Sequence, residues 1–204
     1  MELDVDTLRQ QIPHYLTSSD QKVLLDGLKA IASGGKVDYF LNSYDDSFKN
    51  EMLQGDGWRG FQLFNFNTGK RFSVKGLVLS NSCDIDPENS KQIPSRVIFA
   101  PLVKLEKYRS LLQKNGINQE DIKNAIDSVK AQKTYNALYL PADGPLKEEY
   151  IIRFDDIHSM PTAAHQDTHD KEKLFTLSAI GFYMLVFKLS VHFCRLQEGV
   201  PRKS

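Results

Sequence analysis

The sequence is poor in cysteine and has no long apolar run. Only two of its 204 residues are cysteines, Cys83 and Cys194. They lie far apart and lack the paired spacing of metal ligands, which argues against a secreted disulfide framework and favours a reducing cytoplasm. The N-terminal residues MELDVDTLRQQ contain no charged region followed by an apolar stretch, so no signal peptide is expected.

Charge and hydropathy argue against two further classes of protein. The chain has 26 Lys+Arg and 26 Asp+Glu, which gives a formal net charge of zero. Because phosphate affinity comes largely from neutralising backbone charge, a dedicated DNA-wrapping surface is not expected, although a local basic groove stays open. The most apolar stretch, residues 174–187, is shorter than the roughly 20 residues of a membrane span. We therefore expect a buried helix there and no membrane contact.

What the sequence does contain predicts a helical segment at residues 1–50, followed by a β domain at 51–204. In the first segment, residues 17–20 offer N-caps for a helix that ends at a glycine pair. In the second, the aromatic runs WRGFQLFNFN and RFSVKGLVLS flank a turn at residues 67–70. This arrangement predicts a β-hairpin.

The β domain is expected to contain a helical insertion and to end in a helix. Further strands are predicted at 96–103, 135–140 and 149–154. Residues 104–132 switch to a helical pattern, 155–170 read as a loop rich in His, Asp and Pro, and 171–197 as a long C-terminal helix. Since the short strands show no βαβ alternation, the predicted fold is α+β, a small antiparallel barrel or strongly bent sheet.

Four segments follow one another in the strand order of the PemK/MazF-like SH3-type barrels. The matching residues are VLS at 78–80, APL at 100–102, LP at 140–141 and FDDIHS at 154–159. The chain therefore resembles that superfamily over about residues 74–160, interrupted by the helical insertion. The SxSCDI motif at 80–85 and the terminal LSVHFCRLQE also resemble a set of bacterial proteins of unassigned function.

The resemblance implies a binding protein on an SH3-like barrel, in a toxin–antitoxin or phage-defence setting, with RNA, DNA or a protein as partner. In the ribonucleases of this superfamily, an Arg after the first strand and a Ser or Thr after a later strand support cleavage. Here Val103 and Lys104 occupy the second position, and Arg59 and Arg71 match no clear motif. We therefore expect binding without catalysis, with a toxin-type endoribonuclease as the alternative. No cofactor is expected, and a homodimer is left open.

Cys83 is the main catalytic candidate, because it ends a predicted strand. A thiolate nucleophile needs a pKa lowered by a nearby His, Arg or helix N-terminus. Asp84 and Asp86 would act in the opposite sense, so His158 or His165 would have to compensate. This defines a third hypothesis, a cysteine-dependent enzyme that uses Cys83, Asp84 and His158. The alternative is a small, partly buried cysteine with Asp84 capping backbone N–H groups.

Two polar clusters are candidates for cation sites. From Asp84 onward, Asn89 and Ser95 stand where a calcium loop needs Gly and Glu. His165 and His169 have the spacing to share a helical face and, joined by a cysteine, to hold zinc, but the ligand set is incomplete. No metal site is expected.

The aromatic hairpin is the best case for nucleic-acid contact. Its aromatic residues are Trp58, Phe61, Phe64, Phe66 and Phe72. Aromatic rings stack bases while basic residues hold phosphate, although an ordinary sheet core is the alternative. The residues expected to bind are Trp58, Arg59, Lys70, Arg71, Ser80, Ser82 and Arg96.

Overall fold

The structure is a computed structural model that describes residues 17–33, 35–42, 48–86 and 92–194. The first described helix, α2 (Ser18–Ala32), begins at Thr17, whose side chain and that of Asp20 form a capping box. This confirms the predicted N-cap, while residues 1–16 of the predicted helical segment lie outside the described residues. Helix α2 packs against the C-terminal helix, where Gly27 lies directly against the side chain of Ile180.

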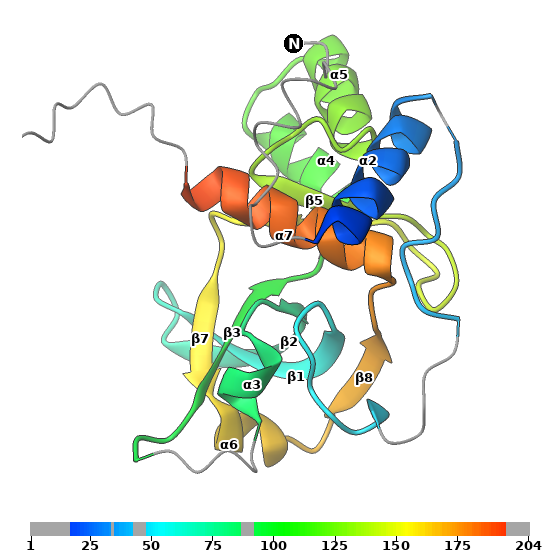
Figure 1. The fold of residues 1–204 in the computed structure, drawn as a ribbon. Coiled ribbons are helices and arrows are strands. Elements are labelled where there is room, and N and C mark those ends of the chain that lie inside the picture. The colour runs from blue at the N-terminus through cyan, green and yellow to red at the C-terminus, as the bar shows by residue number, and fades with distance from the viewer. Residues whose placement is uncertain (1–16, 34, 43–47, 87–91, 195–204) are drawn as a thin grey trace, which may run out of the picture.

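The larger of two antiparallel sheets has five strands in the order β7-β3-β2-β1-β8 (Figure 1). The strands are β1 (Gly57–Asn65), β2 (Lys70–Val78), β3 (Arg96–Pro101), β7 (His158–Pro161) and β8 (Glu172–Phe175). Strands β1 and β2 form the predicted hairpin, with Phe64 paired to Arg71 near its tip.

The smaller sheet has the order β4-β6-β5. It consists of β4 (Val103–Lys104), β5 (Ala137–Leu140) and β6 (Tyr150–Arg153). The chain passes from β3 in one sheet to β4 in the other through Leu102, whose amide donates a hydrogen bond to the carbonyl of Lys75. Pro101 ends β3 opposite Gly76, a position where its missing N–H costs little.

The expected closed barrel is not seen among the described strands, which form two open sheets. The larger sheet ends at β7 and β8, and the smaller one at β4 and β5. The turn of the chain at Leu102 separates the two ladders, and β4 contributes only two residues to its sheet. The coarser expectation, an α+β protein with antiparallel sheets, is confirmed.

The predicted helical insertion lies between β4 and β5. It consists of α4 (Leu105–Lys114) and α5 (Gln119–Lys130). Ile122, Ile126 and Val129 of α5 pack with Ala137 and Ile151 of the small sheet. Figure 1 shows α2, α4, α5 and the C-terminal helix gathered at one end of the molecule, beside the small sheet.

The C-terminal segment differs from the single helix expected at 171–197. Residues 172–175 form β8, which pairs with the start of β1, and the helix α7 spans Ala179–Phe193. Ser178 caps α7 by accepting a hydrogen bond from the Gly181 amide at 3.2 Å. The apolar run 174–187 therefore crosses from a strand to a helix, which periodicity alone does not separate. None of the helices in the described ranges has the length and apolar composition of a membrane span.

The loop expected at 155–170 is also partly ordered into elements. It contains strand β7 and the short helix α6 (Thr162–Gln166). Strand β7 pairs with β3, with Met160 opposite Val97, and the Thr162 amide donates to the Ser95 carbonyl. These tertiary hydrogen bonds, and not local propensity, account for the order of this segment.

Apolar side chains cover both faces of the large sheet. One cluster joins it to the small sheet, α2 and α7, and includes Leu77, Leu138 and Leu185. A second cluster covers the opposite face and includes the rings of Phe61 and Phe99, stacked with centroids 4.1 Å apart and planes at 9°. This second cluster forms the base of the candidate site.

Candidate functional site

A cavity of about 420 Å³ opens over the second apolar cluster, between α3 (Ser82–Ile85), α6 and the segment 50–53. Figure 1 shows α3 and α6 side by side at the end of the large sheet away from α4 and α5. Its apolar lining is Met52, Leu53, Trp58 and Ile85. Its polar lining includes Ser82, Cys83, Asp86, Thr162, His165, Gln166 and Lys171.

The Cys83 wall of the cavity is shaped by side-chain caps on backbone groups. After β2 ends, Ser80 is buried and its Oγ accepts a hydrogen bond from the Ile98 amide at 2.7 Å. Asn81 then caps α3 by accepting from the Cys83 amide at 3.0 Å, and Ser82 Oγ accepts from the Gln54 amide at 2.9 Å. The cap is thus Asn81 and not Asp84, and Cys83 is exposed and not buried under a loop.

His165 lies on α6 and forms the buried wall of the cavity. A β-bulge at Gly60, whose φ is +100°, interrupts the β1–β2 ladder. Beside it the carbonyl of Arg59 lies 3.0 Å from His165 Nε2. The imidazole also contacts the Phe61 ring, with centroids 4.6 Å apart, and meets Trp58 edge to face. His165 is therefore fixed from three sides.

The chemical state of His165 follows from these contacts. A carbonyl oxygen only accepts hydrogen bonds, so Nε2 carries the proton in the neutral ring and Nδ1 keeps a lone pair. Nδ1 is buried and has no hydrogen-bond partner among the described residues. Burial lowers the pKa of His165 below its ordinary value, and the Lys171 ammonium acts in the same direction, whereas the Arg59 carbonyl and Asp170 oppose the shift. The side chain is thus a neutral acceptor at pH 7.

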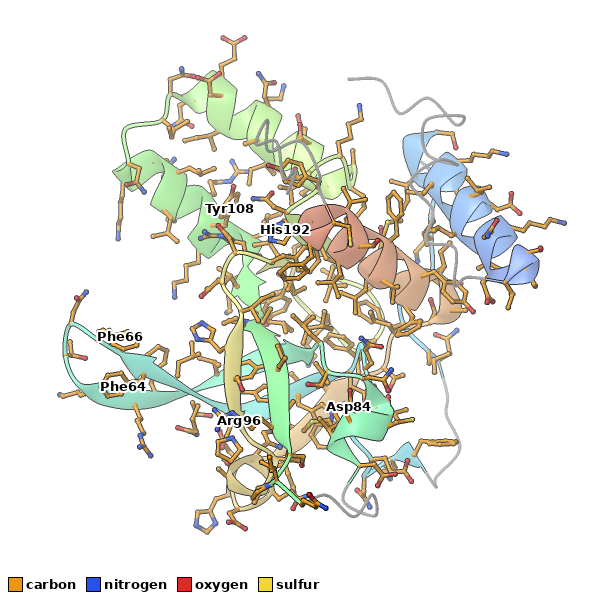
Figure 2. The ribbon with its side chains drawn as sticks, turned by 60° about the vertical axis from the view of Figure 1, so that its left-hand side comes forward. Phe64, Phe66, Asp84, Arg96, Tyr108 and His192 are labelled. Carbon is orange, nitrogen blue, oxygen red and sulfur yellow. The ribbon has the colours of Figure 1, made fainter. Side chains whose placement is uncertain are left out.

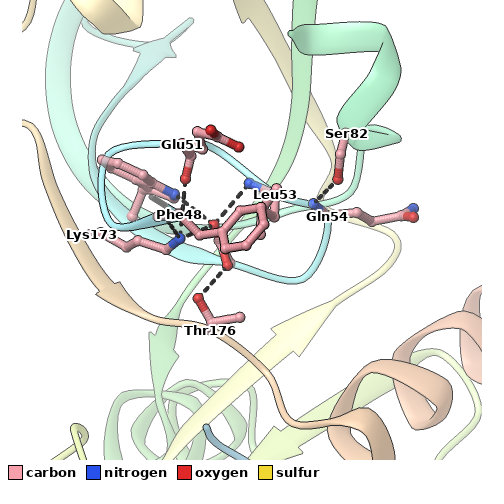
Figure 3. Close-up of polar contacts among 9 residues, drawn as sticks. Phe48, Glu51, Leu53, Gln54, Ser82, Lys173 and Thr176 are labelled. Carbon is pink, nitrogen blue, oxygen red and sulfur yellow. Dashed lines mark hydrogen bonds and ion pairs between the residues drawn. The ribbon is translucent and has the colours of Figure 1, made fainter. Parts of the chain in front are cut away.

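A buried ion pair supports the cavity from behind Trp58. Lys173 Nζ lies 2.9 Å from Asp56 Oδ2, and Asp56 also accepts hydrogen bonds from the Leu53 amide at 2.8 Å and the Thr176 hydroxyl at 2.7 Å (Figure 3). Burial raises the pKa of Asp56, and the Lys173 ammonium opposes that shift. The indole N–H of Trp58 points to the same carboxylate at 3.4 Å.

Lys173 also forms hydrogen bonds to the segment 48–51, which leads into the cavity lining. Its ammonium donates to the carbonyls of Phe48 and Glu51 at 2.9 and 3.1 Å. The sequence did not single out this pair, because Lys173 stands at the edge of an expected helix and Asp56 in an expected turn. The only local signal for the ion pair is that Lys173 directly precedes the apolar run 174–187.

The β1–β2 hairpin is a second candidate surface. It projects from the body of the protein, with Phe64 and Phe66 near its tip (Figure 2). Phe64, Phe66 and Phe72 are 49%, 89% and 46% exposed, and the first two rings meet edge to face at 5.1 Å. Trp58 and Phe61, from the same predicted aromatic group, are buried core residues instead.

The other residues predicted to bind or to act in catalysis are distributed away from the cavity lining. Arg59 forms an ion pair with Glu172 at 2.7 Å, and Arg96 donates to Ser159 Oγ at 2.9 Å. His158 lies on β7, where its Nε2 is 2.8 Å from Asp156 Oδ1. The histidine that shares the cavity with Cys83 is therefore His165, whereas His158 is absent from the described lining.

The structure does not bring the candidate zinc ligands together. His165 lies on α6, but that helix ends at Gln166, so His169 does not continue the same helical face. Within the described ranges, no three side chains of His, Cys, Asp or Glu gather as they would around a metal ion. Asn89, from the calcium comparison, lies outside the described residues.

The sequence was compared with protein-family models and with curated proteins, and the fold with solved structures; none of the three comparisons gives a match for this chain.

Proposed function

We propose that this protein binds single-stranded nucleic acid through the β1–β2 hairpin, on a scaffold related to the PemK/MazF-like barrels. The observation that carries the proposal is the pairing of exposed aromatic rings with basic side chains on a projecting hairpin. The toxin–antitoxin or phage-defence setting implied by the sequence resemblance belongs to the same proposal.

Aromatic and basic side chains share the faces of this hairpin. Arg71 is the cross-strand partner of Phe64, and Lys70 is the partner of Asn65. Directly paired residues project from the same face of an antiparallel ladder. The Phe64 ring and the Arg71 guanidinium are therefore neighbours, an arrangement in which a base stacks on the ring while the cation meets the adjacent phosphate.

The local charge of the hairpin supports the same conclusion. Residues 57–83 contain four basic and no acidic side chains, in a chain whose net charge is zero. Both Lys70 and Arg71 are exposed, and no described carboxylate forms an ion pair with either. The β1–β2 hairpin is therefore locally basic although the whole chain is neutral, and phosphate binding requires such a local positive charge.

Binding without cleavage is the form of the proposal that the side chains favour. Lys104, at the position where the related ribonucleases carry a Ser or Thr, forms an ion pair with Glu148 at 2.8 Å. Arg59 is engaged by Glu172. Both basic side chains are thus engaged in ion pairs with glutamates, so the endoribonuclease alternative finds less support.

The test is fluorescence anisotropy with short single-stranded RNA and DNA oligonucleotides. The double variant Phe64→Ala/Phe66→Ala should weaken binding roughly tenfold or more, because each stacked base contributes about 1–3 kcal/mol. Phe193→Ala, an exposed phenylalanine on α7, is the matched control and should leave binding unchanged. Lys70→Ala/Arg71→Ala should lower the slope of log affinity against log salt by about 1.4.

Two results would contradict this function. One is the absence of saturable binding to either nucleic acid at low salt, and the other is equal affinity of the wild type and the Phe64/Phe66 variant. The same oligonucleotides should remain intact after incubation, whereas cleavage that Lys70→Ala/Arg71→Ala abolishes would establish the ribonuclease alternative.

A second candidate function is thiol chemistry at Cys83. The observation that supports it is that Cys83 and the neutral acceptor His165 line the same cavity. If His165 activates the thiol, iodoacetamide should alkylate Cys83 at least roughly tenfold faster than Cys194, and His165→Gln should remove the difference. Equal alkylation rates of the two cysteines would rule this candidate out.

A further inference from the structure

We propose that the cavity between α3, α6 and segment 50–53 binds a small neutral heteroaromatic molecule that carries an N–H donor, the chemical class of the nucleobases. This site is separate from the hairpin and does not depend on its function. The cavity volume of about 420 Å³ lies within the range of roughly 300–1,000 Å³ for small-molecule sites, with room for a base and its sugar.

The unsatisfied Nδ1 of His165 is the main argument for an occupant. The residue is 0% exposed, and Nδ1 has neither water access nor a protein partner among the described residues. Burying an acceptor without a hydrogen bond is unfavourable, and such atoms are uncommon in folded proteins. A molecule that donates an N–H to Nδ1 would satisfy it.

The geometry specifies which hydrogen-bonding group the occupant needs. Nε2 is used by the Arg59 carbonyl at 3.0 Å, and that carbonyl fixes the proton on Nε2. Only Nδ1 is left for a molecule in the cavity, and it can only accept. The ligand must therefore contribute a donor, which excludes a ligand whose only polar groups are carboxylate or carbonyl oxygens.

The remaining lining fits a flat, uncharged ring. Met52, Leu53 and Ile85 give apolar walls, and the lining carries charges of both signs, Glu51 and Asp86 against Lys171. The excess of one acidic side chain disfavours an anionic ligand, and the apolar walls favour an uncharged ligand over a cation. The Gln166 side chain adds a group that can donate and accept, as the edge of a nucleobase requires.

Access to Nδ1 requires a small adjustment of the cavity. Because Nδ1 is closed to water in this conformation, the ligand must displace a lining side chain to reach it. Met52 is the suitable one, since it is partly buried and methionine side chains adapt their shape readily. Trp58 and His165 are fixed by contacts with β1, α6 and the Asp56 carboxylate.

The decisive experiment uses two substitutions of His165, each of which keeps a polar group near only one of the two ring nitrogens. His165→Gln keeps an N–H near the position of Nε2 and has no acceptor near Nδ1, whereas His165→Asn keeps a polar group near Nδ1 and loses the contact to Arg59. Adenosine, guanosine, cytidine and uridine serve as probes. Binding is measured by calorimetry and by protection of Cys83 from iodoacetamide within each variant, with Cys194 as the internal control.

We expect at least one nucleoside to bind the wild type saturably. His165→Gln should weaken that binding roughly tenfold or more at unchanged melting temperature. His165→Asn should retain part of the binding. A second variant, Cys83→Trp at an exposed position, should narrow the cavity and abolish binding by calorimetry, even if His165→Gln fails to fold. Equal affinity of the wild type and a folded His165→Gln would overturn the proposal.

Oligonucleotides distinguish two sources of the ligand. If free nucleosides bind and Phe64→Ala/Phe66→Ala leaves that binding unchanged, the ligand is a small molecule. If only oligonucleotides protect Cys83, and His165→Gln removes the protection, the base is presented by a bound strand. If neither nucleosides nor oligonucleotides protect Cys83, the cavity proposal is wrong, and anisotropy with the hairpin variants still decides the proposed function separately.

Discussion

Lys173 Nζ lies 2.9 Å from Asp56 Oδ2, and the two side chains are 5% and 0% exposed. The contact joins strand β8 to the turn that precedes β1, two segments far apart in the sequence. Lys173 also holds the carbonyls of Phe48 and Glu51. Because both charged groups are buried, the stability of each charged form depends on the other group and on the surrounding hydrogen bonds.

Removing one partner of this pair should be strongly destabilising. We expect Asp56→Ala to lower the free energy of unfolding by about 3–5 kcal/mol, because it leaves the Lys173 ammonium buried without a counter-charge. Urea denaturation followed by Trp58 fluorescence measures the effect, and Trp58 is the only tryptophan of the chain.

The matched control is Asp155→Ala, which breaks the exposed pair with Arg153 and should cost about 0–1 kcal/mol. The double variant Asp56→Ala/Lys173→Met should be more stable than Asp56→Ala alone. A cost of Asp56→Ala no greater than that of Asp155→Ala would contradict the assignment of a buried, interdependent pair.

The stability contribution of Lys188 should depend on pH in the alkaline range. Lys188 is buried in α7, where its Nζ donates to the carbonyls of Thr134 and Ala137 at 2.8 and 2.6 Å. Burial lowers the pKa of Lys188 to about 7 from 10.5. Between these two values the unfolded chain binds a proton that the folded chain has lost, so stability rises with pH.

Subtracting the unfolding free energy of Lys188→Met from that of the wild type isolates this effect. The difference should increase by about 2 kcal/mol from about pH 8 to about pH 10. A flat difference would mean that the two carbonyls keep Lys188 charged in the folded state.

His165 should titrate below the ordinary histidine value of about 6.5, because burial lowers its pKa. Nitrogen-correlated NMR spectra should show the proton on Nε2 at neutral pH. The folded chain then binds fewer protons than the unfolded chain around the ordinary value, so this group's contribution to stability is lost as the pH falls through about 6.5. Detection of the proton on Nδ1 would contradict the contact with the Arg59 carbonyl and the ligand chemistry derived from it.

Gly76 should tolerate no side chain, because it lies under the stacked rings of Phe61 and Phe99. A Cβ at this position would lie 2.6 Å from Phe61 and 2.9 Å from Phe99. Gly76→Ala should therefore cost about 1–3 kcal/mol in denaturation, as overpacked cores do. Gly116→Asn is the control, since nothing lies within 4 Å of that glycine and asparagine tolerates its left-handed backbone. Equal small effects would show that the rings move aside easily.

The elements predicted correctly are those whose signals are local. Thr17 and Asp20 mark the start of α2 by side-chain capping, and the turn at 67–70 lies between two aromatic runs of strand character. Both signals involve residues close in sequence, so no tertiary information was needed.

The elements that were missed depend on contacts between distant residues. Strand β7 exists because Met160 pairs with Val97 of β3, and β8 because Phe175 pairs with Gly57 of β1. At the site, the sequence points to Cys83 with His158 as its catalytic partner, whereas the structure places His165 in the same cavity. The choice of histidine depends on the bulge at Gly60 and on the placement of α6, which no local pattern encodes.

Strands β3 and β4 form one run of chain, residues 96–104, that is interrupted only by Leu102, and the amide of Leu102 is itself bonded to the Lys75 carbonyl in β2. This run therefore contributes one strand to each sheet and connects the two sheets directly. Neither sheet can open without disturbing hydrogen bonds of the other, so the slowest-exchanging amides should form a single cooperative unit across both sheets.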